Sequence, residues 1–162
     1  FQLVAAMNPC PCGYLGDPSG RCRCSAEQIQ RYRSKLSGPL LDRIDLHLHV
    51  AREATALHAN PDSGTSSAQA AATVAAARQR QEQRQGGANA FLDLQQLRQH
   101  CGLSDDDQHW LESACERLGL SLRAAHRLLK VARTLADLDA VDAIQRSHLA
   151  EALQYRPSSP TA

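Results

Sequence analysis

The pattern of apolar and polar positions divides this chain of 162 residues into two parts. In the first part, the apolar run over residues 1–7 predicts a buried strand, and the strict alternation over residues 44–50 predicts a half-buried one. Between them, Ser25 and Gln28 have the spacing of a capping box, which predicts a helix that runs to about Leu36. The expected order is therefore strand, cysteine-rich loop, helix, strand.

The second part is expected to be entirely helical. Residues 67–85 are strong helix formers that stop at two glycines, and leucines at helical spacing follow over residues 92–102. Ser104 and Ser121 are expected to cap two further helices, and a short helix precedes the tail. The fold class is therefore mainly α. The predicted divisions are an α/β piece at 1–58, a linker at 59–65, a helical domain at 66–156 and a disordered tail at 157–162.

Composition and charge limit the functions to consider. The formal net charge of +1 creates no general attraction for nucleic acid, so a DNA contact would require local basic patches. An aromatic content of 4% disfavours single-strand binding by base stacking. No run reaches membrane-spanning length and no secretory signal is present, which predicts a cytoplasmic protein without a membrane partner. Because the chain opens on Phe1 inside an apolar run, it is expected to be a fragment.

Cysteine clustering is the strongest chemical signal in the sequence. Four cysteines fall within fifteen positions, in two C-x-C pairs: Cys10, Cys12, Cys22 and Cys24. In a reducing compartment such a cluster favours a closed, structural zinc site, since four thiolates complete a tetrahedron. The alternative is that they pack as small apolar residues, and disulfides are less favoured than either. Cys101 and Cys115 are expected to be buried apolar residues, and His47 and His49 to be solvated.

Three single polar residues stand out by position. Asn8 follows the first predicted strand, Arg43 precedes the second, and Arg123 lies in the first turn of a predicted helix. The stretches around them, "LVAAMNPCPCGYLGD", "SGPLLDRIDLHLHV" and "LSLRAAHRLLKVARTLADL", closely resemble the magnesium-chelatase-like AAA+ ATPases, specifically the ComM (YifB) competence-protein group. The resemblance covers nearly the whole chain. It implies the end of an AAA+ α/β core followed by the helical AAA+ lid.

The resemblance also implies roles for these residues. Asn8 corresponds to sensor 1, Arg43 to the arginine finger and Arg123 to sensor 2, so Asn8 and Arg123 would contact the nucleotide. The longer protein would be a hexamer that uses ATP and Mg²⁺, acts on DNA and drives branch migration during natural transformation. The sequence contains no G-x-x-x-x-G-K-[ST] loop and no acidic magnesium-binding strand. This chain alone is therefore expected to be inactive as an ATPase.

Two other functions remain open from the sequence. One is a motor subunit of magnesium chelatase, which inserts Mg²⁺ into a porphyrin; the cysteine loop favours the ComM-like group over it. The other is a non-enzymatic, zinc-stabilised helical module that binds DNA or protein. Its basic faces would consist of Arg78, Arg80 and Arg84 on one helix and of Arg123, Arg127 and Lys130 on another.

Overall fold

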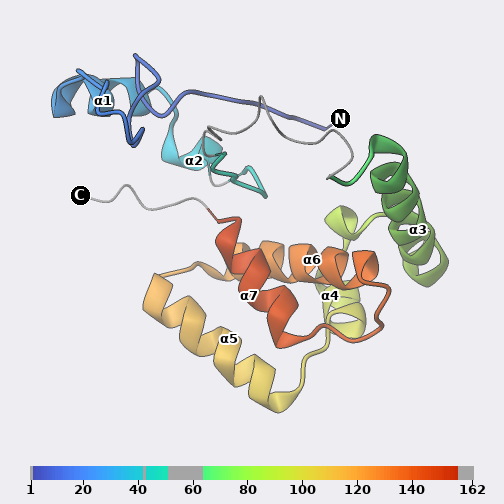
Figure 1. Ribbon diagram of the computed structural model, residues 1–162. Coiled ribbons are helices and arrows are strands. Elements are labelled where there is room, and N and C mark those ends of the chain that lie inside the picture. Colours follow the sequence, from blue (N-terminus) through green and yellow to red (C-terminus); the bar gives the residue numbers. More distant parts are fainter. Residues whose placement is uncertain (1, 42, 51–63, 157–162) are drawn as a thin grey trace. The chain divides into compact units, whose positions relative to one another are not determined.

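The computed structural model describes residues 2–41, 43–50 and 64–156 and divides the chain into two compact units. The first takes in Phe1–Ile44 and Val50–Ala54, and the second takes in Asp45–His49 and Thr55–Ala162. All regular structure in the described residues is helical, which confirms the mainly α fold class (Figure 1). The predicted boundaries at 58 and 66 stay predictions, because residues 59–63 and the predicted tail lie outside the described residues.

In the first unit, a looped segment leads into two short helices, α1 (Ala26–Arg33) and α2 (Gly38–Leu41). The predicted capping box is confirmed: Ser25 Oγ accepts from the Gln28 backbone N–H, and the Gln28 side chain accepts from the Ser25 backbone N–H. Helix α1 ends three residues earlier than expected, in a turn that precedes α2.

The two predicted strands are not formed in the described residues, so these predictions were wrong. Residues 2–7 and 44–50 have no ladder of backbone hydrogen bonds, and most of their apolar side chains are exposed, including Val4 and Leu48. A strand is stable only when it pairs with neighbouring strands. The alternation of apolar and polar residues shows which face of a strand would be buried, but it does not show whether a neighbouring strand is present to pair with it. Residues 45–49 instead belong to the second unit, where the His47 N–H donates to Tyr155 O at 2.7 Å.

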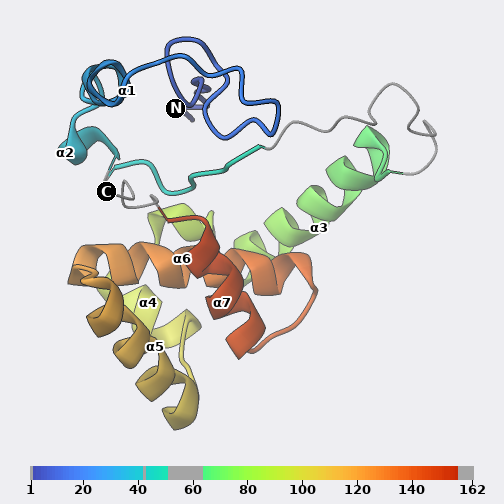
Figure 2. The ribbon, with the colours of Figure 1, turned by 60° about the vertical axis from the view of Figure 1, so that its left-hand side comes forward.

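The second unit is a helical bundle organised around one central helix. Helix α6 packs against α7, α3, α4 and the short 3-10 helix η1, and α3 runs outward from the bundle (Figure 2). The elements are α3 (Ser67–Gln85), η1 (Asn89–Phe91), α4 (Leu94–His100), α5 (Asp105–Leu118), α6 (Leu122–Leu138) and α7 (Arg146–Gln154).

Helix ends in this unit follow the signals in the sequence. Ser104 and Ser121 cap α5 and α6, and each hydroxyl accepts a backbone N–H from the first turn, as predicted. Gly86 and Gly119 end α3 and α5 with positive φ values of 72° and 61°, a conformation that glycine adopts without a Cβ clash. Among the described residues, no helix has both the length and the apolar character to cross a bilayer.

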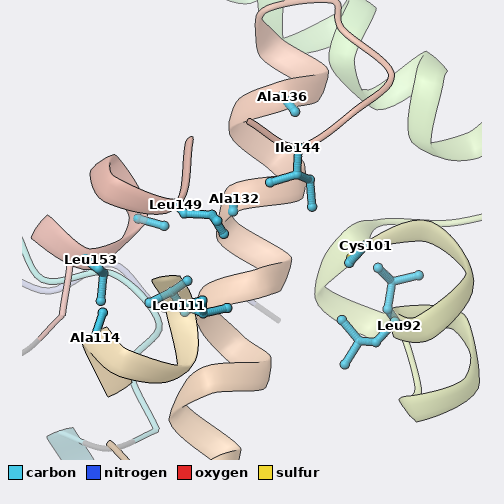
Figure 3. Packing of buried hydrophobic residues seen from close by; sticks show 12 residues of the cluster. Leu92, Cys101, Leu111, Ala114, Ala132, Ala136, Ile144, Leu149 and Leu153 are labelled. Carbon is cyan, nitrogen blue, oxygen red and sulfur yellow. The ribbon is translucent and has the colours of Figure 1, made fainter. Parts of the chain in front are cut away.

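One apolar cluster holds the bundle together. Leu111 from α5, Ala132 from α6 and Leu149 from α7 point toward one another, and the small Ala132 lets α7 approach α6 closely (Figure 3). Leu92, Leu97 and Cys101 extend the cluster to η1 and α4. Cys101 is buried as predicted, and burial raises the pKa of its thiol to about 11. Cys115 is only partly buried against the same cluster.

A buried polar network joins α3 to α6. Arg84 donates to both oxygens of Asp137 at 2.6 and 2.9 Å, and Asn89 Nδ2 donates to Asp137 Oδ2 at 2.8 Å. Arg133, four residues before Asp137 on α6, reaches the same carboxylate at 3.2 Å and also donates to the carbonyl of Val141 at 2.7 Å. The Asp137 side chain is only 2% exposed, so its charge depends on these donors.

We expect Asp137→Ala to lower the free energy of unfolding by about 3–5 kcal/mol, because two arginines would lose their buried carboxylate. Burial raises the pKa of Asp137, but hydrogen bonds from Arg84 and Asn89 outweigh it, so the pKa is lowered. A lowered carboxyl pKa stabilises the fold above the unfolded-state pKa, and this stabilisation is lost as the pH falls through the acid range. Urea unfolding at pH 7 and at a pH below 3.8, the ordinary pKa of the carboxyl, measures both effects. The exposed Asp142→Ala is the control, and equal stability of the two variants would contradict the role of the network.

Candidate functional site

The four clustered cysteines come together at one point of the first unit. Their Sγ atoms all lie within 4.8 Å of one another, although Cys10 and Cys24 are fourteen residues apart. Local turns produce this approach: the Gly13 N–H donates to Cys10 O at 3.0 Å, and two further turns at Asp17 and Gly20 reverse the chain. The predicted grouping of these residues is therefore present in the structure.

The spacing of the sulfurs fits a tetrahedral metal centre. Cys10 Sγ lies 3.4 Å from Cys12 Sγ and 3.8 Å from Cys22 Sγ, and Cys12 Sγ lies 3.7 Å from Cys22 Sγ. A zinc ion with four sulfur ligands at about 2.3 Å requires sulfur–sulfur edges of about 3.8 Å. The cluster can thus hold a metal ion with little rearrangement.

The four thiols of the cluster differ in how easily they ionise, because the pKa of each depends on its neighbours. A hydrogen bond from the Tyr14 backbone N–H, together with those from Cys10 and Cys24, lowers the pKa of Cys12 to about 6. For Cys24, a hydrogen bond from the Cys12 backbone N–H lowers the pKa. The side chain of Cys12, burial and the side chain of Cys10 have the opposite effect and together raise the pKa of Cys24 to about 12. Neighbouring thiolates therefore oppose one another, and a bound cation would relieve this repulsion.

Asn8 lies at the entrance to the cysteine loop and is exposed. Its side-chain Cγ and Nδ2 lie 3.7 Å from the position that a Cβ on Gly13 would occupy, and Gly13 has a φ of +81°. The turn that begins at Cys10 thus brings the backbone of Gly13 close to the amide of Asn8. The cysteine loop and the predicted sensor 1 residue are parts of one local structure.

Arg43 lies just after α2 and is exposed. Its guanidinium donates from Nη1 to Pro39 O at 2.6 Å, which holds the side chain against the preceding helical turn. Among the described residues, no carboxylate forms an ion pair with Arg43 and no hydrogen bond joins it to Asn8. Its charge is therefore not neutralised within the part of the chain that the structure describes.

Arg123 lies in the first turn of α6 in the second unit and is exposed. The cap at Ser121 sets the start of this helix, since its hydroxyl accepts from the Ala124 N–H at 3.2 Å. The structure brings the four cysteines together and Asn8 close to their loop, whereas Arg123 belongs to the other unit. His49 is exposed, as predicted, and His47 is partly buried.

Sequence reasoning missed the role of Arg84. It was assigned to a basic face, but its guanidinium is bound to Asp137 and Asn89 inside the polar network. The i,i+4 spacing of Arg133 and Asp137 was a signal for a buried ion pair on α6, and nothing in the sequence indicated that Arg84 joins it. This finding weakens the alternative of a basic helical adaptor.

Comparisons with known proteins agree with the two-part organisation. The model for "Magnesium chelatase, subunit ChlI C-terminal" matches residues 64–156, more than half of the chain, and the model for "Magnesium chelatase, subunit ChlI" matches residues 1–57. The chain belongs to the magnesium chelatase ChlI family. The resemblance to this family that the sequence indicated is therefore confirmed.

Within this family, the chain is similar to several individual proteins over almost its whole length. The chain is 51% identical to the uncharacterized protein YifB of Escherichia coli and 48% identical to the competence protein ComM of Haemophilus influenzae, in each case over 96% of its length. It is 39% identical to the uncharacterized protein Rv2897c of Mycobacterium tuberculosis. The chain spans only 30 to 31% of the length of these three relatives.

Proposed function

We propose that the chain is part of a ComM-like AAA+ motor that hydrolyses ATP and drives branch migration of DNA. The observation that carries this proposal is its 48% identity to the competence protein ComM over 96% of the chain, across both units. The longer protein is proposed to be a hexamer that requires ATP and Mg²⁺. The chain supplies the residues that sense nucleotide and complete a neighbouring active site.

Each residue type suits its proposed task. Phosphoryl transfer depends on positioned charge and a positioned water rather than on covalent chemistry. The neutral amide of Asn8 orients the attacking water without removing its proton. The planar, permanently charged guanidinium of Arg43 stabilises the charge that develops on the γ-phosphate, and the absence of a carboxylate partner among the described residues leaves it available for this task. Arg123 links the nucleotide to the position of the lid helices.

The cysteine cluster is proposed to hold one structural zinc ion through Cys10, Cys12, Cys22 and Cys24. The sulfur–sulfur distances of 3.4 to 3.8 Å support this assignment. When bound, the ion supplies a closed cross-link and no open coordination position. The cysteine side chains then fix the loop next to Asn8, which limits how far the amide can move from the geometry that catalysis requires.

A magnesium chelatase motor is the competing function, since the family models carry that name. The two functions make opposite predictions for the longer protein that contains this chain. We expect it to convert a synthetic branched DNA into its strand-exchanged products when ATP and Mg²⁺ are present, and to produce none of them with ADP. We expect no insertion of Mg²⁺ into protoporphyrin in the presence of the other chelatase subunits. Porphyrin metallation without DNA branch migration would contradict the proposal.

A further inference from the structure

A groove of about 470 Å³ lies beside the cysteine loop and shares Cys12 and Cys24 with the candidate metal site. Pro11 and Cys12 line it from the loop, and Arg31, Tyr32 and Lys35 line it from α1 and the turn that follows. The groove lies entirely within the first unit. It therefore combines an aromatic and an apolar side chain with two cations in one local structure.

Charge around the groove favours an anionic ligand. Between residues 9 and 36 the chain has five basic side chains and two carboxylates, and the excess of three positive charges is larger than the two negative charges of Zn²⁺ with four thiolates. One carboxylate, Asp17, is paired with Arg21 at 3.9 Å. Within the described residues, no ion pair involves Arg31 or Lys35. Their charges are therefore free to contact a ligand.

The arrangement of these side chains fits a nucleotide of a single strand. Arg31 in α1 and Lys35 in the turn after it both line the groove, so the two cations can contact successive phosphates of one strand. Tyr32 and Pro11 also line the groove, and an aromatic ring there can stack on an unstacked base. Polyglutamate would satisfy the cations but would have no ring to place against Tyr32. In duplex DNA the bases remain stacked inside the helix and cannot enter.

We propose that this groove binds single-stranded DNA, with phosphates at Arg31 and Lys35 and one base against Tyr32. The inference rests on the proposed DNA-motor function and identifies which surface of this chain contacts the strand. The low aromatic content of the sequence disfavours single-strand binding by base stacking, but the groove needs only one tyrosine to stack on one base. The metal cross-link would hold the loop side of the groove against α1.

The test measures how tightly the 162-residue chain binds a fluorescein-labelled oligothymidylate of about 20 nucleotides. Fluorescence anisotropy gives the dissociation constant at salt concentrations between about 50 and 200 mM. We expect Tyr32→Ala to weaken binding by about 5- to 100-fold. We expect the double variant Arg31→Ala/Lys35→Ala to weaken it about tenfold at 50 mM salt and to reduce the salt slope by about 1.4, which corresponds to two lost phosphate contacts. Circular dichroism and metal content verify that each variant is folded.

Matched controls are available in the second unit: the exposed basic pair Arg98 and Arg117, and the exposed Phe91. Arg98→Ala/Arg117→Ala and Phe91→Ala should leave binding within about twofold of wild type. Equal losses in the groove and control variants, or displacement of the oligonucleotide by polyglutamate with no effect of Tyr32→Ala, would overturn the inference. If the chain fails to bind while the longer protein binds DNA, the inference fails and the motor function stands. If the longer protein also fails to bind DNA, both fail.

Discussion

Replacing Arg43 by alanine in the longer protein is expected to lower ATP turnover by about 10³- to 10⁵-fold. The guanidinium is proposed to stabilise charge that develops only in the transition state, so its loss should reduce kcat and leave nucleotide affinity nearly unchanged. Within the described part of the chain, the Arg43 guanidinium donates to a backbone carbonyl, that of Pro39 at 2.6 Å, and forms no ion pair with a carboxylate. Steady-state hydrolysis and the binding of a fluorescent nucleotide measure the two effects separately.

Two controls distinguish a catalytic arginine from a structural one. Arg43→Lys keeps the charge but loses the planar, two-pronged donor, so we expect most of the activity to be lost there as well. Arg78→Ala removes an exposed arginine on α3 and should retain full turnover. If Arg43→Ala hydrolyses ATP at the wild-type rate, Arg43 is a helix-end residue and not an arginine finger.

Cys22→Ser is expected to abolish metal binding by the chain. Protein prepared without chelators should contain about one zinc per chain, and the variant should contain none, because a structural site with three thiolates loses both an anionic ligand and its closed geometry. Structural zinc contributes about 10–16 kcal/mol in small zinc-dependent folds, so its loss should release the loop between Asn8 and α1. Elemental analysis measures the ion, and limited proteolysis measures cleavage within residues 9–24.

Cys115→Ser is the matched control for this experiment. Cys115 is partly buried on α5 and is not a member of the four-cysteine cluster, so its substitution should leave the zinc content unchanged. Metal-free wild-type protein in which the loop resists proteolysis would contradict the zinc assignment. The cysteines would then be small packing residues, which is the alternative that the sequence left open.

Helices were predictable from the sequence because their signals are local. Ser25, Ser104 and Ser121 cap the helices that they were expected to cap, and Gly86 and Gly119 end theirs. These predictions depend on bonds within one or two turns, which a single stretch of sequence specifies. Strand formation depends on a partner elsewhere, and the alternation over 44–50 carried no information about whether a partner is present.

At the candidate site, the sequence predicted which cysteines come together, but it did not predict the tertiary contacts of Arg84 or the groove beside the cysteine loop. The two C-x-C pairs indicated a common metal site, and the structure places all four sulfurs within 4.8 Å. The burial of Arg84 against Asp137 was not predictable, because 53 residues separate the partners and only the packing of α3 on α6 joins them. The groove at Tyr32 likewise requires α1 to fold against the cysteine loop. Its basic residues were visible in the sequence, but the cavity was not.

We propose that this chain completes an ATP site held by a neighbouring subunit, and this proposal can be tested by mixing two defective variants. Two variants of the longer protein are mixed in equal amounts. One carries Arg43→Ala, and the other has its phosphate-binding lysine replaced. Neither variant alone should hydrolyse ATP. If Arg43 acts across the interface, random mixed rings should recover about a quarter of wild-type turnover, because one in four interfaces pairs an intact phosphate site with an intact finger. Turnover that stays at the sum of the two separate variants would contradict the claim.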